Sequence, residues 1–146
     1  MLDYDEYERR CEKIRKTNDK LISLFQNSLI AEGLSEKTVK RHVGNAKFYI
    51  NDYLLRTAPR PMKCGIREIG SFLGYYAIRT CLCSSPYELK SVAAGIKKFY
   101  KCMAENGKIE NRDYDDLCMA IKWDMPYWIE DCIQFRDPSQ PSPFIC

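Results

Sequence analysis

Apolar residues recur at intervals of three and four along this chain, and no stretch alternates apolar and polar residues as a half-buried β-strand does. That spacing places the apolar side chains on one face of a helix, so the sequence predicts an all-α protein. The helices are expected over residues 5–32, 36–56, 66–79, 86–105 and 113–135. We expect them to form a four-to-five-helix bundle.

Residues with helix-capping chemistry mark the ends of these segments. Ser35 is placed to cap the second helix, and Gly33 to end the first. Ser85 is followed by a proline at the first helical position and by Glu88, which is the clearest helix start in the chain. Because a proline inside a helix loses a hydrogen bond and clashes with the preceding turn, we expect Pro126 to kink or split the last helix.

Three features of the second and third segments concern packing. Gly70 and Gly74 lie four residues apart, a spacing that lets another helix approach closely. Phe48 lies among basic residues, where its ring could stack on a nucleic acid; packing against a neighbouring helix is the alternative. His42 lies near the apolar edge of the second segment, and we interpret it as a structural histidine.

Length and composition fit one compact domain. The chain has 146 residues, of which 45% are hydrophobic and 29% charged, as in an ordinary globular protein. We expect a single helical domain over residues 1–136 and a flexible tail over residues 137–146, which hold three prolines and two serines.

The formal net charge of +3 conceals a strong partition along the chain. Residues 35–101 hold 13 Lys and Arg against 4 Asp and Glu, whereas residues 102–146 hold 4 against 9. A central block this basic suggests a polyanionic partner. The alternative is that the lysines only keep helix faces in contact with water.

Eight cysteines would fit a secreted disulfide framework, but the N-terminus has no basic region followed by an apolar one. No apolar stretch approaches the ~18 residues of a membrane span. We therefore expect a cytoplasmic, reduced chain without a membrane partner, in which most cysteines are small buried apolar residues. Cys81 and Cys83 form the only metal-like spacing, and because the single histidine lies far away, no metal site is expected.

Most catalytic patterns are missing from the sequence. A single histidine excludes mechanisms that need a histidine pair, and there is no phosphate-binding glycine loop, dinucleotide fingerprint or nucleophile elbow. Asp113, Asp115 and Asp116 lack calcium-loop spacing and are better placed to cap a helix. The sequence therefore predicts a protein that is not an enzyme and has no cofactor.

Two stretches carry a family resemblance. The first has a Gly-Leu-Ser turn at residues 33–35, a Lys-Thr-Val start at 37–39, and a Phe-to-Tyr ending at 48–53. The second runs from a Ser-Pro start at residues 85–86 to Lys-Lys-Phe-Tyr at 97–100 and a Gly-Lys-Ile turn at 107–109. Residues 18–117 thus resemble the core-binding (SAM-like, N-terminal) domain of tyrosine recombinases and phage integrases.

The resemblance implies an orthogonal helical bundle whose second and fourth helices face duplex DNA. In that family the cleavage chemistry of DNA recombination belongs to a separate C-terminal domain, with an arginine, a His-x-x-Arg box and a tyrosine nucleophile. The present chain has no room for such a domain after the helical one. We therefore expect a non-catalytic DNA-binding module.

The second and fourth segments carry basic residues opposite their apolar ones, and these are the predicted DNA contacts. They are Lys37, Lys40, Arg41, Lys47, Lys90, Lys97, Lys98 and Lys101. Such side chains mainly contact phosphates and so set affinity and register. Ser35 and Thr38 could add neutral phosphate contacts, with helix capping as their alternative role.

The acidic C-terminal segment is not explained by the resemblance. It is rich in large aromatic residues, namely Tyr114, Trp123, Tyr127, Trp128 and Phe135. Because Trp and Tyr are common interface anchors, the alternative function is a helical protein-interaction or adaptor domain, which could self-associate through this segment. The segment could instead cover the bundle. In a third hypothesis it folds over the basic faces and inhibits DNA binding, so that deleting residues 112–146 would strengthen binding.

Overall fold

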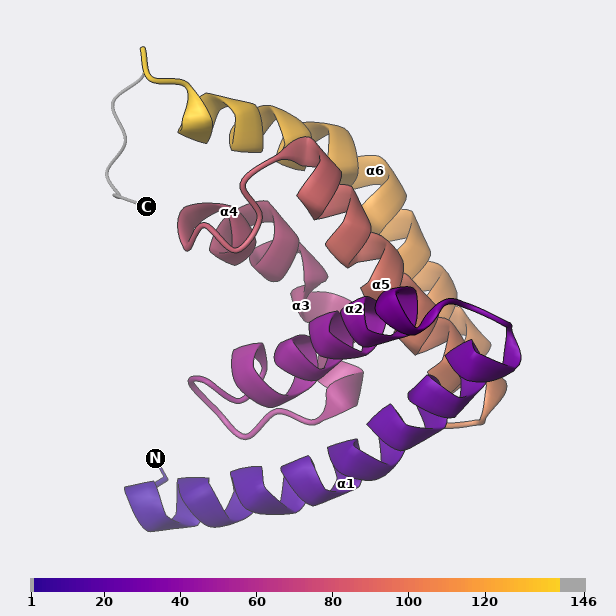
Figure 1. The fold of residues 1–146 in the computed structure, drawn as a ribbon. Helices are drawn as coiled ribbons and strands as arrows, with labels where there is room; N and C mark the ends of the chain where they lie inside the picture. The colour runs from indigo at the N-terminus through magenta and orange to yellow at the C-terminus, as the bar shows by residue number, and fades with distance from the viewer. Residues whose placement is uncertain (1, 140–146) are drawn as a thin grey trace.

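The computed structural model describes residues 2–139 and confirms an all-α bundle, with no strand among these residues (Figure 1). Its elements, in chain order, are α1 (Tyr4–Ala31), α2 (Glu36–Lys47), η1 (Phe48–Tyr53), η2 (Met62–Cys64), α3 (Gly65–Ser71), η3 (Phe72–Tyr76), α4 (Ala77–Arg79), α5 (Pro86–Glu105) and α6 (Asn111–Arg136). Here η1 and η3 are π-helical and η2 is a 3₁₀ turn. A single apolar core receives side chains from α1, α2, α5 and α6 and from the helical segments between α2 and α5.

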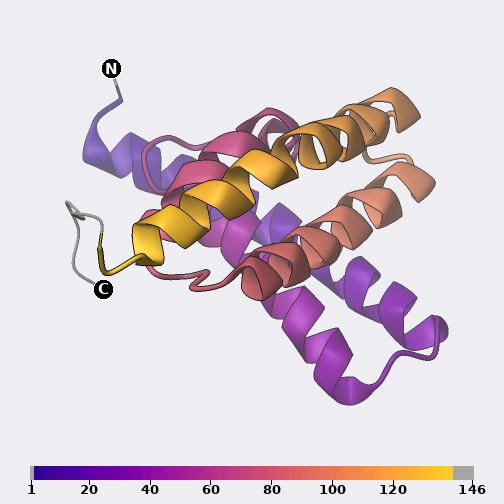
Figure 2. The same cartoon turned by 90° about the horizontal axis from the view of Figure 1, so that it is seen from above.

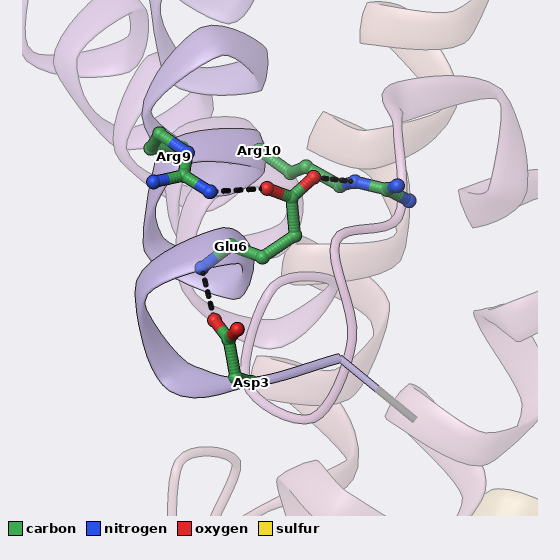
Figure 3. Close-up of polar contacts among 4 residues, drawn as sticks. All are labelled: Asp3, Glu6, Arg9 and Arg10. Atoms are coloured by element: carbon green, nitrogen blue, oxygen red, sulfur yellow. Dashed lines mark hydrogen bonds and ion pairs between the residues drawn. The ribbon is translucent and has the colours of Figure 1, made fainter.

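The first helix is continuous, and polar side chains define its beginning. Asp3 caps α1 by accepting a hydrogen bond of 2.8 Å from the backbone N–H of Glu6. The carboxylate of Glu6 in turn binds Arg9 and Arg10 (Figure 3), and these contacts lower the pKa of Glu6. The helix ends as predicted, at Gly33, whose φ of +82° is left-handed.

The other predicted caps are also confirmed. The Ser35 hydroxyl accepts a hydrogen bond of 3.2 Å from the Thr38 N–H at the start of α2. Ser85 caps α5 in the same way, at 3.2 Å from the Glu88 N–H. The Glu88 carboxylate accepts from the Ser84 backbone at 2.6 Å, and this contact lowers the pKa of Glu88.

Two π-helical segments extend helices that the sequence predicts as regular. η1 continues α2 and η3 continues α3, so the helical path agrees with the predicted segments 36–56 and 66–79. Tyr49 is buried beside Ile50, three residues after the buried Ala46 and four before the buried Tyr53. The two segments meet through aromatic rings, with the Phe72 centroid 4.8 Å from that of Tyr49 and 4.7 Å from that of Tyr53.

A neighbouring helix, α6, packs against Gly70 and Gly74, as the spacing of the two glycines predicts. A Cβ atom on Gly74 would lie only 2.5 Å from Nε1 of Trp128, and one on Gly70 would lie 4.0 Å from the same indole. Since only glycine leaves room at position 74, α6 packs with Trp128 directly against this surface. Trp128 is therefore a core residue, only 6% exposed.

Pro126 does not split the last helix, contrary to one of the two expected outcomes. α6 runs from Asn111 to Arg136 with this proline inside it, and lies beside α5 (Figure 2). Pro126 and Lys122, whose carbonyl loses its helical donor, are both exposed, so water can replace the missing bond. α6 begins at Asn111, two residues before the predicted start, with Glu110 as its N-cap; Asp113 contributes to the capping box, because its carboxylate accepts from the Glu110 N–H at 3.1 Å.

The end of the described chain follows α6 directly. Residues 137–139 are non-helical, and the rest of the predicted tail, 140–146, lies outside the described residues. Within residues 2–139, no helix combines the length and apolar character required to cross a bilayer.

Candidate nucleic-acid interface

All eight predicted DNA contacts are exposed, four on α2 and four on α5. We call them the basic surface: Lys37, Lys40, Arg41, Lys47, Lys90, Lys97, Lys98 and Lys101. The two helices pack directly against each other. The amphipathic pattern of both helices was sufficient to predict that these side chains lie outside the core.

The crossing of α2 and α5 is built on one glycine and one histidine. A Cβ atom on Gly95 would lie 2.8 Å from Nδ1 of His42 and 3.5 Å from its Cα, so a larger residue would push the helices apart. His42 is 6% exposed, and its Nδ1 has no hydrogen-bond partner among the described residues. The structure thus confirms His42 as a packing residue.

Burial and the charges around this crossing disfavour the protonated form of the imidazole. Burial is the main cause that lowers the pKa of His42, and the cations Arg41 and Lys98 lower it further. Glu32 opposes them but does not reverse the shift. Basic side chains from both helices, Arg41 of α2 and Lys98 of α5, thus act on the same ring.

Few of these charges are neutralised within the fold. Lys98 pairs with Glu32 at 3.4 Å and Lys40 with Glu36 at 3.6 Å, both between exposed side chains. The other six form no ion pair with a residue in the described part of the chain. Exposed pairs contribute little to stability, so even the two paired lysines can exchange their partner for a phosphate.

Part of the basic surface turns away towards α6. Lys90 and Lys97 line a groove of about 450 Å³ between α5 and α6, and Lys122 of α6 lines it too. We call this the α5–α6 groove; its other walls include Ala93, Ile121 and Met125. Lys122 was missed by the sequence analysis because it lies in the acidic C-terminal segment, where only the packing of α6 on α5 brings it beside Lys97.

Other basic residues of the central block hold the fold together. Arg60 forms an ion pair with Glu68 and donates to the Leu54 carbonyl at 2.9 Å. The guanidinium of Arg56 lies over the Tyr53 ring, 4.0 Å from its centroid. These arginines add to the charge count of residues 35–101 but are occupied by structural contacts.

The other candidates for contact with a nucleic acid, Phe48, Ser35 and Thr38, make contacts within the fold. Phe48 packs against Phe72 and Tyr76, with centroid separations of 6.2 and 6.4 Å, which is the packing alternative to stacking on a nucleic acid. Ser35 contacts Thr38 both through its cap and through a hydroxyl pair at 2.9 Å. The basic side chains are thus the main candidates for contacts with a polyanion.

The C-terminal segment is an integral layer of the bundle. Leu117, Ile121, Trp128 and Cys132 of α6 are buried against α5 and the third helical segment. No ion pair within residues 2–139 joins an α6 carboxylate to the basic surface. Deletion of residues 112–146 would expose the core, so truncation cannot test the self-inhibition hypothesis.

Among residues 2–139, six cysteines are free thiols and Cys81 is bonded. Cys83, Cys102 and Cys132 are free and buried, and burial raises the pKa of Cys83 to about 12. This agrees with their interpretation as small apolar residues. Cys81 is disulfide-bonded, so the expectation of a reduced chain is wrong at this residue. Among residues 2–139, no group of three or more His, Cys, Asp or Glu side chains is arranged to hold a metal ion.

No family model, curated protein or solved structure matches this chain. The likeness to the integrase core-binding domain therefore rests on the sequence motifs alone.

Proposed function

We propose that this chain is a non-catalytic DNA-binding module that contacts duplex phosphates through the basic surface of α2 and α5. One observation carries the proposal: eight basic residues selected from the sequence are all exposed, on two helices that pack against each other, and six have no ion pair with a described residue. A high density of available cations on adjacent helices is the electrostatic feature that polyanions require.

The expected mode of binding is phosphate contact with counterion release. Lysine is a flexible point charge, and a surface with seven lysines and one arginine favours phosphate contacts over bidentate reading of base edges. We therefore expect affinity that depends strongly on salt and weakly on sequence. If all eight side chains contact phosphates, the logarithm of the binding constant should fall with a slope of about −7 against the logarithm of the salt concentration.

The proposal is tested with a double charge reversal on α2. Lys37 and Lys47 are exposed and form no ion pair with a described residue, so Lys37→Glu, Lys47→Glu should leave the core intact. We expect duplex binding, measured by fluorescence anisotropy at ~100 mM salt, to weaken at least about tenfold and the salt slope to decrease by about 2.

A matched control carries the same change in net charge elsewhere. Lys16 and Lys20 lie on the exposed side of α1, outside the basic surface. Lys16→Glu, Lys20→Glu should weaken binding much less, because only general attraction is lost. Equal losses in the two double variants would show that net charge, and not this surface, governs binding.

A second candidate function, a protein-interaction domain, is favoured by a separate observation. α6 presents large apolar side chains to solvent that the bundle does not bury, with Trp123 65% and Tyr127 68% exposed. This surface is distinct from the α2 face of the basic surface, so the two functions do not exclude each other.

A further inference from the structure

The α5–α6 groove has the same residue spacing on both of its walls. Each helix contributes residues at positions i, i+3, i+4 and i+7, which are Lys90, Ala93, Ala94 and Lys97 on α5 and Cys118, Ile121, Lys122 and Met125 on α6. This spacing keeps side chains on one face of a helix for two turns, or about 10 Å. Because α5 and α6 lie side by side (Figure 2), the groove follows both helices over this length.

The floor of the groove is apolar. Ala93 and Ile121 are buried, and Cys118 and Met125 are half-buried beside them. The two alanines of α5 leave space above the floor, and Met125 has a flexible side chain that can adapt to a ligand. The volume of about 450 Å³ lies in the range of known ligand sites. Water alone now covers this apolar surface, so a partner with apolar side chains would gain from filling it.

The charge of the groove has one sign. Lys90, Lys97 and Lys122 are exposed, no Asp or Glu lines the groove, and none of the three lysines pairs with a described residue. Lys122 is the one lysine of α6, a helix that holds six Asp and Glu residues. An apolar floor with three available cations is complementary to a ligand that is apolar on one face and acidic at its edges.

The floor distinguishes this ligand from the DNA of the proposed function. Phosphates contact lysines through their charge, and they offer no apolar group that would cover Ile121 and Met125. An amphipathic helix with acidic flanks meets both requirements, because its apolar stripe has the same spacing as the two walls.

We propose that the α5–α6 groove binds an acidic amphipathic helix of a partner protein. Apolar side chains of that helix, three and four residues apart, lie on the floor, and its Asp or Glu residues face Lys90, Lys97 and Lys122. A groove of two turns makes a small interface, so we expect a dissociation constant between about 10 μM and 1 mM. Lys90 and Lys97 also belong to the basic surface, so the partner and DNA should compete for them.

Binding is tested without nucleic acid, so its failure leaves the proposed DNA contact untouched. The probe is a fluorescent helical peptide of about 14 residues, with Leu at the spacing above and Glu at the flanking positions. Lys90→Glu, Lys122→Glu should weaken its binding at least about tenfold, measured by anisotropy. A second peptide, with Lys in place of Glu, should bind this variant better than the wild type. A folding defect would not produce that exchange of preference.

Two cysteines of the wild-type chain locate the bound peptide. Cys118 and Cys64 are both free and half-buried, but Cys118 lines the α5–α6 groove and Cys64 lines a different cavity, together with Arg67. Maleimide labelling of each thiol is followed by mass spectrometry. With the acidic peptide at about ten times its dissociation constant, Cys118 should react about tenfold more slowly, because only the free groove is accessible. The rate at Cys64 should not change.

The matched control for charge is Lys16→Glu, Lys20→Glu on α1, which has the same net charge as the groove variant and should bind the acidic peptide nearly as the wild type does. Absence of binding up to about 1 mM peptide, equal affinity of the wild type for both peptides, or equal protection of the two cysteines would overturn the proposal. Protection of Cys118 that grows with protein concentration alone would assign the groove to a second copy, and would overturn it too.

Discussion

The outer faces of α2 and of α6 are built on the same core but present opposite chemistry. On α2 the exposed side chains include Lys37, Arg41 and Lys47, and its large aromatic neighbour Phe48 is half-buried against Phe72. On α6 the exposed row holds Trp123 and Tyr127, with carboxylates at its ends. A polyanionic partner requires exposed cations, whereas a protein partner requires exposed apolar side chains. The contrast therefore indicates two separate binding faces.

If the exposed row of α6 is a binding face, folding does not depend on Trp123, and this gives the prediction with the largest effect. Trp128 packs against Gly74 inside the bundle, so Trp128→Ala should lower the free energy of unfolding by about 3–5 kcal/mol. Trp123→Ala, on the same helix, should change it by no more than about 0.5 kcal/mol. Urea denaturation of both variants measures the difference. Comparable losses would show that Trp123 is part of the folded core.

A smaller change in the free energy of unfolding is expected from the protonation of His42, which lies at the crossing of α2 and α5. The fold lowers the pKa of this residue, so the unfolded chain takes up a proton near pH 6.5 while the folded chain does not. The free energy of unfolding should therefore fall as the pH decreases through 6.5, and level off below the folded-state pKa. Each unit of lowering corresponds to about 1.4 kcal/mol.

The control for this prediction is His42→Gln, which removes the titrating group. Urea denaturation between pH 7.5 and 5.5 should show a decline in the wild type and a nearly flat profile in the variant. The carboxyls of Glu6, Glu88 and Asp137 have pKa values below their ordinary range, so their contributions are lost only at lower pH. A wild-type profile as flat as that of the variant would contradict a neutral, buried His42.

Local sequence patterns were sufficient for the helices and their caps. Ser35 and Ser85 cap helices through contacts three residues away, so nothing distant is needed to recognise them. The packing of Tyr49 on Phe72 could not be predicted in this way, because that contact joins residues far apart in the chain.

In the candidate site, too, local features could be predicted from the sequence and contacts between distant residues could not. Exposure of the lysines followed from the helical periodicity of α2 and α5. Contacts between helices could not be predicted, because each depends on how two helices cross. They are the contact of Gly95 with His42, the pairing of Lys98 with Glu32 and the presence of Lys122 in the same groove as Lys97. The charge of residues 35–101 identified the candidate surface only in part, because two of its basic residues, Arg56 and Arg60, make contacts within the fold.

The measurement that tests the central claim most directly is a titration of the wild-type chain with a short DNA duplex at salt concentrations from about 50 to 300 mM. Our account predicts binding at the lowest salt and a straight line of log binding constant against log salt, with a slope between about −4 and −7. No binding at about 50 mM salt, or an affinity that does not change with salt, would contradict the assignment of α2 and α5 as a phosphate-binding surface.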